Sequence, residues 1–496
     1  MKKQAVNPYL PCYEYIPDGE PHVFGERVYI YGSHDRFNAP IFCVNDYVCY
    51  SAPVNDLSDW KYEGVIYSKK QDPKNKLGIH LLFAPDVVQG PDGKYYLYYA
   101  YDFMGIMGVA VCDTPAGKYS FYGHVRYPNG KLWGRTKGDQ FPFDPGVLHD
   151  DGRIYLYSGF YTAVPAFMTG FYKLKNDGGV VLELERDMLT IKAGPKLLFP
   201  KKGKGSFEGH EFFEASSIRK KDGRYFFVYS SVHNHELCYA VSNYPDRDFK
   251  FGGTLISQGD LFLEGEENEC KALNYLGNNH GGIEEINGKW YIFYHRQTNQ
   301  HSFSRQACAE KLTLDEDGNF KQAEVTSCGL NEDSLQGFGT YEARIACNLF
   351  SKNGVGRYDG KHAKKRLQEH PYFTQTGKDV SPEQVKAGKK EPQQYIANMR
   401  DGAVAGFKYF RFNGLEKIAV KIRTTTDGIM QISTDLKFEN IIAEILVQKT
   451  NDIQKYEGEC TMKSIQGVHP LYFRFAGNGI LDFYEIELKN KEQREK

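Results

Sequence analysis

Residues 214–231, EASSIRKKDGRYFFVYSS, decide the fold because their pattern occurs five times along the chain. The pattern is an acidic or polar residue, a small residue or proline, an apolar strand, a Gly-containing turn and an aromatic strand. The other copies open at Glu20 and His280 or lie around Asp86 and Asp144. Asp-Gly or Asn-Gly in most of the turns is a strong hairpin signal. The aromatics that alternate after each turn are typical of half-buried strands.

The spacing of the copies indicates repeated four-stranded units. Their leading residues are separated by 66, 58, 70 and 66 residues: Glu20, Asp86, Asp144, Glu214 and His280. Each interval is long enough for about four strands, and such units repeated around an axis form a β-propeller whose innermost strands face a central channel. We therefore predict an all-β chain with a five-bladed β-propeller over residues 1–330.

A second domain is predicted after the repeat ends at Gly329. Residues 351–395 are polar, basic and glycine-rich, which favours long loops with a short helix near Pro382–Lys386. Alternating strands then return, among them GFKYFRFNG and HPLYFRFAG, and TYEARIACNLF from Thr340 is a candidate first strand. These segments predict a β-sandwich over residues 331–496.

Composition agrees with an all-β chain and argues against several other classes. Aromatic residues make up 15% of the 496 residues and there are 50 glycines, which favours short strands and tight turns. A net charge of -1 argues against a nucleic-acid partner, and no apolar run is long enough to cross a membrane. The N-terminus lacks the apolar core of a signal peptide, and the ten cysteines form no C-x-x-C pairs. We expect reduced thiols and a cytoplasmic protein.

The leading residues of the five copies are a candidate active site. In a propeller the starts of the innermost strands converge at one mouth of the channel, which would gather two glutamates, two aspartates and a histidine. Carboxylates gathered in this way shift one another's pKa. Hydrolysis of a glycosidic bond needs a protonated carboxyl to assist the leaving group and an ionised one to activate water. The set therefore predicts a glycosidase, although any one of these acids could merely fix a turn.

The same motifs carry a family resemblance. NPYLP at Asn7, VYIYGSHD through Asp35, FAPDVVQGPDGKYYLYY, FDPGVLHDDGRIYLY, FFEASSIRKKDGRYFF and HGGIEEINGKWYIFYHR together resemble glycoside hydrolase family 43. The resemblance implies a five-bladed propeller that hydrolyses α-L-arabinofuranosides, β-xylosides or related polymers with inversion. It implies an exo-acting enzyme on pentose-containing plant oligosaccharides, with no required cofactor. The C-terminal region resembles a carbohydrate-binding module of family 6.

The resemblance also implies roles for single residues. Glu214 resembles the general acid, and Asp86 resembles the carboxylate that orients the acid and tunes its pKa. His280 resembles an axial histidine that lies near a central water or a bound calcium ion. Four matched residues are expected to contact the substrate: Asp35, Asp144, His280 and Arg296.

The first copy departs from the family pattern. Relatives usually have Ala-Asp-Pro where this sequence has Gly19-Glu20-Pro21, so we expect Glu20 to be the general base. Asp18 is the alternative base, because residues two apart on a strand point to the same face. The departure keeps two other functions open, a galactan-degrading exo-hydrolase of the same fold and a non-catalytic carbohydrate-binding propeller.

A pair of histidines, His233 and His235, is a weaker signal. No Cys or His at ligand spacing completes a zinc site around them in the sequence. We expect a loop that contacts substrate or solvent.

Overall fold

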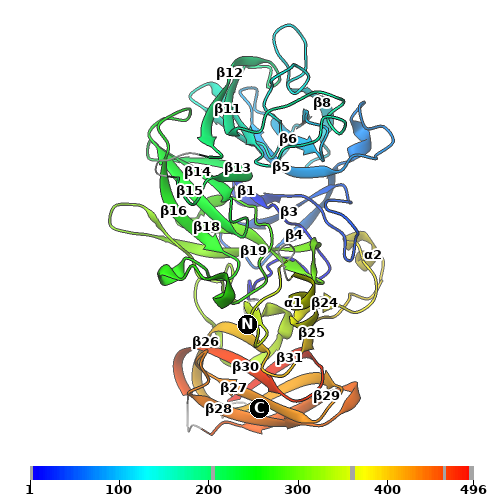
Figure 1. Ribbon diagram of the computed structural model, residues 1–496, viewed down its shortest axis with the longest axis vertical. Coiled ribbons are helices and arrows are strands. Elements are labelled where there is room, and N and C mark those ends of the chain that lie inside the picture. The colour runs from blue at the N-terminus through cyan, green and yellow to red at the C-terminus, as the bar shows by residue number, and fades with distance from the viewer. Residues whose placement is uncertain (1–3, 203–206, 358–362, 462–464, 491–496) are drawn as a thin grey trace.

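The computed structural model describes residues 4–202, 207–357, 363–461 and 465–490 (Figure 1). Four-stranded antiparallel sheets form the upper part of the molecule in Figure 1, and a larger sheet system forms the lower part. The prediction of an all-β chain, with a five-bladed β-propeller followed by a β-sandwich, is confirmed.

Each blade is a meander of four strands in chain order. The first blade contains β1 (Glu20–Phe24), β2 (Arg27–Tyr31), β3 (Tyr47–Pro53) and β4 (Lys61–Tyr67). The second contains β5 (Leu82–Gln89), β6 (Tyr95–Tyr101), β7 (Met107–Cys112) and β8 (Ser120–His124). The third contains β9 (Gly146–Asp150), β10 (Arg153–Gly159), β11 (Gly178–Leu184) and β12 (Ile191–Pro200). The fourth contains β13 (Phe212–Lys221), β14 (Arg224–Ser231), β15 (Glu236–Ser242) and β16 (Lys250–Ser257). The fifth contains β17 (Ile283–Ile286), β18 (Lys289–Thr298), β19 (His301–Leu314) and β20 (Phe320–Lys321).

The first strands of the blades surround the channel and close into a ring. β1 packs against β5 and β17, and β13 packs against β9 and β17. A parallel bridge between Gly19 and Gly281 joins the first blade to the last. The N-terminal segment adds a second tie, because the Asn7 amide donates to the Ala309 carbonyl at 2.9 Å and to Glu310 Oε1 at 2.7 Å. The two ends of the repeat region therefore hold each other in place.

Aromatic side chains fill the space between the blades. Tyr67 and Tyr99 lie in the core between the first and second blades, with their hydroxyl oxygens 2.8 Å apart. Tyr99 donates onward to Asp72 Oδ2 at 2.8 Å, so its hydroxyl is satisfied although the ring is buried. The aromatic richness of the chain thus serves propeller packing. All ten cysteines are free thiols, as their spacing predicts.

The sandwich is built around one long bent strand, β26 (Val404–Thr424). The first half of β26 pairs with β23 and β30, and its second half pairs with β29 and β31. The other strands of this domain are β21 (Leu335–Gln336), β22 (Gly339–Glu342), β23 (Asn348–Phe350), β24 (Tyr372–Gln375), β25 (Gln394–Met399), β27 (Gly428–Ser433), β28 (Ile441–Val447), β29 (Thr450–Glu459), β30 (Ile465–Ala476) and β31 (Leu481–Asn490).

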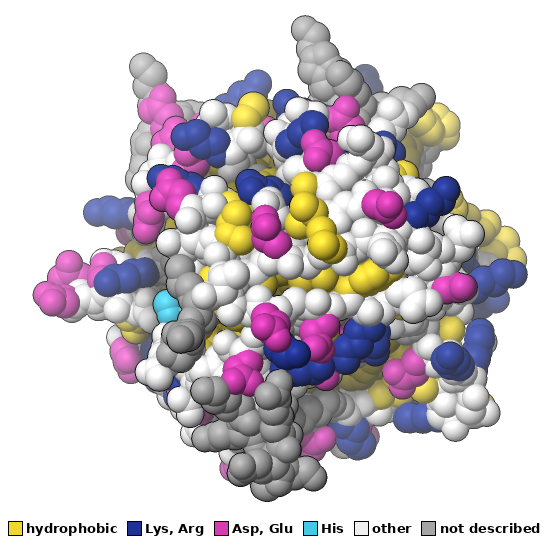
Figure 2. Space-filling model, turned by 90° about the horizontal axis from the view of Figure 1, so that it is seen from below, with side chains coloured by type: hydrophobic (Ala, Val, Ile, Leu, Met, Phe, Trp, Pro, Cys, Tyr) yellow, Lys and Arg dark blue, Asp and Glu magenta, His cyan; other side chains and the backbone are white. Residues whose placement is uncertain are grey.

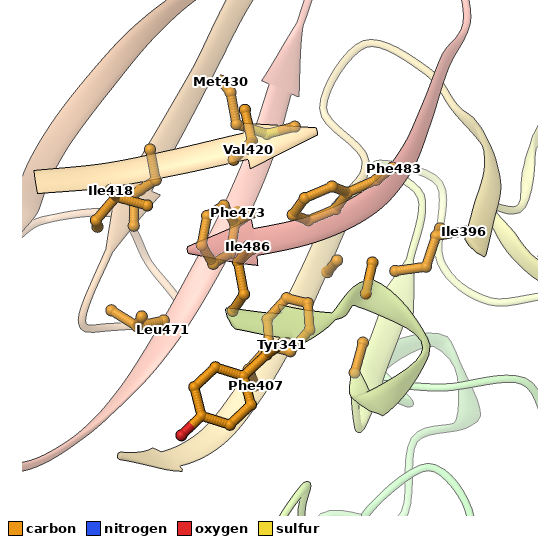
Figure 3. Close-up of a cluster of buried hydrophobic side chains, with 14 of the residues drawn as sticks. Tyr341, Ile396, Phe407, Ile418, Val420, Met430, Leu471, Phe473, Phe483 and Ile486 are labelled. Carbon is orange, nitrogen blue, oxygen red and sulfur yellow. The ribbon is translucent and has the colours of Figure 1, made fainter. Parts of the chain in front are cut away.

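Most of the large apolar side chains of the sandwich domain lie in one buried core. Figure 3 shows side chains from β22, β25, β26, β27, β30 and β31 gathered in this core, including Tyr341, Ile396, Phe407, Ile418, Met430, Phe473, Phe483 and Ile486. Tyr395 lies outside this core and stacks on Tyr484 with ring centres 4.5 Å apart. Seen from the sandwich end, basic and acidic side chains are scattered over the surface, and hydrophobic side chains are exposed between them (Figure 2). The resemblance to a family 6 binding module stays a prediction.

The segment between β23 and β25 returns to the propeller and carries both α-helices, α1 (Ala363–Glu369) and α2 (Pro382–Lys386). Helix α2 was predicted from the sequence, and Ser381 begins it with a capping box. Helix α1 was not predicted. Tyr15 of the propeller donates to Gln375 Oε1 at 2.6 Å, which ties this segment to the N-terminal region. Within the described ranges, no helix has the length and apolar character needed to cross a bilayer.

Candidate active site

A cavity of about 530 Å³ opens where the innermost strands begin. All five blades contribute to its lining, because Asp18 precedes β1, Phe83 lies near the start of β5, Asp144 precedes β9, Glu214 lies near the start of β13 and His280 precedes β17. Seven phenylalanines form much of its wall: Phe42, Phe83, Phe103, Phe143, Phe160, Phe213 and Phe303. The polar groups that could do chemistry are Asp18, Asp144, Glu214, His280 and Arg305.

Asp18 is held as an ionised carboxylate. Arg305 Nη1 donates to Asp18 Oδ1 at 2.8 Å, and the backbone N–H of Asp18 donates to His295 Nδ1 at 3.3 Å. Burial alone would raise the pKa of Asp18, but the charges of Arg305 and His280 outweigh it and lower this pKa below the usual value. An ionised carboxylate that lines a cavity can accept a proton from water.

Asp35 acts through Arg305 and does not line the cavity. Arg305 Nε and Nη2 donate to the two oxygens of Asp35 at 2.9 and 3.1 Å, a bidentate arrangement that fixes the guanidinium plane. The backbone N–H of Cys43 also donates to Asp35 Oδ1 at 2.9 Å. Asp35 was expected to contact the substrate; the structure places it behind Arg305 as a positioning residue.

Asp144, Glu214 and His280 form a second group of titratable side chains, whose pKa values are raised where that of Asp18 is lowered. Asp144 Oδ2 accepts from the backbone N–H of Ala215 at 3.1 Å and lies 3.4 Å from His280 Nδ1. Burial and the charge of Asp144 raise the pKa of Glu214 to about 8. Burial opposes protonation of His280, but Asp144 and the other carboxylates raise the pKa of His280 to about 9. Near neutral pH Glu214 is therefore protonated and Asp18 is ionised in one cavity, which Asp102 and Asp144 also line.

The backbone at two of these carboxylates is unusual. Asp18 and Asp144 have φ angles of 57° and 44°, in the left-handed region that side-chain-bearing residues rarely occupy. Both lie two residues before the first strand of a blade. This shared local geometry makes Asp18 and Asp144 structural equivalents in the first and third blades.

Glu20 and Asp86, two of the three residues expected to be catalytic, do not line the cavity. Glu20 is the first residue of β1, and its Oε1 accepts from Ser217 Oγ and lies 2.8 Å from Arg219 Nη2. Asp86 is the fifth residue of β5 and contacts His22 Nε2 at 2.6 Å. Each residue along a strand adds about 3.3 Å, so both side chains lie deeper in the channel, in a buried ionic network.

Arg296 was also expected to face the substrate, but the structure places it elsewhere. Its guanidinium donates to the Ala346 carbonyl at 3.2 Å and lies 3.8 Å from the ring centre of Phe373, next to the sandwich domain. Arg305 on the neighbouring strand pairs with Gln297, the residue after Arg296. Because successive side chains point to opposite faces of a strand, Arg305 faces the cavity and Arg296 does not.

Three further polar residues line the cavity, and for only one of them, Asn234, did the sequence predict a loop that contacts substrate or solvent. Asn234 Oδ1 and Ser302 Oγ are buried without a hydrogen-bond partner among the described residues, which makes them available to sugar hydroxyls. Asn234 belongs to the histidine loop noted in the sequence. Arg357 follows β23 and pairs with Glu269 at 2.5 Å, so the C-terminal part of the chain also lines the cavity. Arg357 lies beyond the repeat, and no sequence pattern pointed to it.

A calcium ion near His280, bound through water, stays a prediction. Calcium takes six to eight oxygen ligands. Among the described residues, ligand atoms of three or more side chains come together at His210, His233 and Glu236 and at Glu20, His22 and Asp86, not around His280. The raised pKa of His280 also makes this ring a cation that balances Asp144. Direct coordination of a metal by His280 does not fit these surroundings.

Comparison with known proteins agrees with this geometry. The family model "Glycosyl hydrolases family 43" matches residues 16–320. The chain belongs to glycosyl hydrolase family 43. The matched residues include most of those that line the cavity, and the protein is a glycoside hydrolase.

Two of the relatives are both named xylosidase/arabinosidase. A "Xylosidase/arabinosidase" of Thermoclostridium stercorarium is 49% identical over 97% of this chain and 98% of its own length. A "Xylosidase/arabinosidase" of Bacteroides ovatus is 30% identical over 58% of this chain and 87% of its own length. Among solved structures, a family 43 arabinoxylan arabinofuranohydrolase from Bacillus subtilis aligns over 99% of both chains at 19% identity, with a TM-score of 0.48.

Proposed function

We propose that this family 43 protein is an inverting, exo-acting glycosidase of pentose-containing oligosaccharides, a β-xylosidase or α-L-arabinofuranosidase. The observation that carries the proposal is the pair of carboxyls with opposite pKa shifts in one cavity, Glu214 raised and Asp18 lowered. The 49% identical relative is named a xylosidase/arabinosidase, which supports this substrate class.

In this mechanism Glu214 is the general acid and Asp18 is the general base. Glu214 protonates the glycosidic oxygen as the bond breaks, and Asp18 takes a proton from the water that attacks the anomeric carbon. Asp144 keeps Glu214 protonated by its charge. Arg305 keeps Asp18 ionised and fixed in orientation. The base is therefore assigned to Asp18 instead of Glu20, and the acid-tuning carboxylate to Asp144 instead of Asp86.

The size and lining of the cavity support exo action on short chains. A volume of about 530 Å³ is within the range of clefts that bind small molecules. Phenylalanine rings offer apolar faces to the C–H faces of a sugar, while Asn234 and Ser302 offer hydrogen bonds to its hydroxyls.

A panel of nitrophenyl glycosides tests the function. We expect turnover of the β-xyloside or the α-L-arabinofuranoside, with a first product of inverted anomeric configuration by proton NMR. Turnover of the β-galactoside alone would replace the pentose assignment by galactan degradation. Binding of xylo-oligosaccharides without turnover of any glycoside would indicate a non-catalytic binding propeller.

The pH profile gives a second prediction. Glu214 acts in its protonated form, so kcat/KM should fall as pH rises through the pKa of Glu214, about 8. In Asp144→Asn the negative charge that helps to raise this pKa is gone, so the alkaline limb should move down by about one pH unit or more. Asp102→Asn is the matched control, because Asp102 lines the cavity but is not among the groups that shift Glu214. An alkaline limb that stays in place in Asp144→Asn would contradict this role.

A further inference from the structure

A second cluster of titratable side chains lies in the fourth blade, outside the catalytic machinery. His210 comes just before β13, His233 lies in the turn between β14 and β15, and Glu236 begins β15. One ring nitrogen or carboxylate oxygen from each of the three lies within 4.8 Å of the others. The fold thus supplies the ligands that the sequence around His233 lacked, because β13 and β15 flank β14 in the same sheet.

Glu236 provides a buried, fixed and ionised carboxylate at the base of the cluster. Its side chain has no solvent exposure. Oε1 contacts His210 Nδ1 at 2.7 Å and accepts from Ser231 Oγ, and Oε2 accepts from Thr254 Oγ1 at 2.9 Å. Three donors on the two oxygens stabilise the ionised form of this carboxylate. A buried carboxylate is costly unless a cation accompanies it.

The side chains around Glu236 include further donor atoms that suit a metal ion. The rings of His210 and His233 have centres 5.6 Å apart, and each lies 5.2 Å from the ring centre of Phe262. His235, the next histidine, is buried and its Nε2 has no hydrogen-bond partner among the described residues. Cys238 Sγ lies 3.9 Å from His210 Nδ1. Two imidazoles and one carboxylate, with a thiol nearby, are donors that zinc prefers.

We propose that His210, His233 and Glu236 form a binding site for a divalent transition-metal ion, with Zn²⁺ the ion that this donor set fits best. The ion would replace the proton shared by His210 and Glu236, and water or Cys238 Sγ would be the fourth ligand. Zinc bonds of about 2.0–2.2 Å place two ligand atoms roughly 3.3 Å apart, so the 2.7 Å contact must open by some tenths of an ångström. His210 lies just before β13, outside the strand itself.

The ion would act on substrate binding through the loop that it fixes. Asn234 directly follows His233, has a φ of 69° and lines the cavity with its unpaired Oδ1. The backbone N–H of Asn279, next to His280, donates to the Asn234 carbonyl at 2.8 Å. Metal bound at His233 would therefore hold Asn234 in position against the cavity. The site takes no part in proton transfer and does not depend on which sugar is cleaved.

Metal titration of the untagged, full-length protein tests the site. After treatment with EDTA, we expect wild type to take up one equivalent of Zn²⁺ in competition with a chromogenic chelator, and one equivalent of Co²⁺ with the visible absorption of a four-coordinate ion. His233→Ala, at a half-buried position, should weaken Zn²⁺ binding at least about tenfold, as the loss of a ligand requires. His149→Ala, a partly exposed histidine on β9, is the matched control and should bind as wild type does.

Thermal unfolding provides a readout that does not depend on activity. At one Zn²⁺ concentration the Tm of wild type and of His149→Ala should rise, and that of His233→Ala should rise by clearly less. If His233→Ala fails to fold, His210→Ala carries the same comparison. The proposal is overturned if wild type binds no stoichiometric ion, or if both ligand variants bind Zn²⁺ as tightly as wild type.

Discussion

Glu214→Gln is expected to lower kcat on unactivated xylo- or arabino-oligosaccharides by about 10²–10⁴-fold, the usual contribution of a positioned general acid. Glutamine occupies the same space but cannot give up a proton to the glycosidic oxygen. The structural cause is the environment that keeps Glu214 protonated, burial together with the charge of Asp144. The variant should fold normally, because glutamine has the shape of the protonated, uncharged carboxyl that it replaces.

The dependence on the leaving group identifies the role of Glu214. A dinitrophenyl glycoside departs without protonation, so Glu214→Gln should cleave it at a rate within roughly tenfold of wild type. Rates on a series of aryl glycosides with leaving groups of increasing pKa measure this directly. An equal loss on every leaving group would show that Glu214 is not the acid.

Asp18→Asn is expected to lower kcat by a similar factor, about 10²–10⁴-fold, but on all substrates alike. The attacking water needs a base whichever group leaves, and asparagine cannot take its proton. The loss also leaves Arg305 with one anionic partner, Asp35, so the guanidinium should stay in place. Kinetics on the dinitrophenyl and natural substrates give the comparison.

Two results would count against this role of Asp18. One is a loss confined to substrates with poor leaving groups, which is the signature of an acid. The other is a pH profile of kcat/KM whose acid limb is unchanged in Asp18→Asn, because the lowered pKa of Asp18 should set that limb in wild type.

The propeller could be predicted from the sequence because its signals are local. A hairpin such as Ile283–Ile286 paired with the start of Lys289–Thr298 is specified by the Asn-Gly turn between the two strands and by alternating aromatics. Five such hairpins at similar spacing then give the number of blades. Helix α1 and the contact of Arg357 with the cavity were missed because they lie outside the repeat.

The lining of the cavity was predicted only in part because it depends on depth in the channel. Glu214, His280, Asp144 and, as the alternative base, Asp18 were predicted site residues that line the cavity. Aligning the copies by their letters places Glu20 and Asp86 at equivalent positions, but Asp86 is the fifth residue of β5 and lies in a buried network with His22. The left-handed φ of Asp18, which turns its side chain to the cavity, has no signal in the sequence.

Residues that meet across strands were the hardest to predict. Arg305 reaches Asp18 across 287 positions of sequence, and His210 reaches Glu236 across 26. In both cases one partner lies on a strand and the other lies just before a strand, and a one-residue change of register would turn the strand residue to the other face. Arg296 illustrates the point, since it lies opposite Gln306 and faces the sandwich side instead of the cavity.

The most direct test of the assigned base is kcat/KM of Asp18→Asn and Glu20→Gln on one xyloside or arabinofuranoside, each normalised to its folded fraction by circular dichroism. We predict a loss of about 10²-fold or more for Asp18→Asn. Glu20→Gln should stay within about tenfold of wild type, because Glu20 lies below the cavity and Arg219 retains Glu284 at 2.9 Å. A large loss in Glu20→Gln beside near-normal activity in Asp18→Asn would contradict the account.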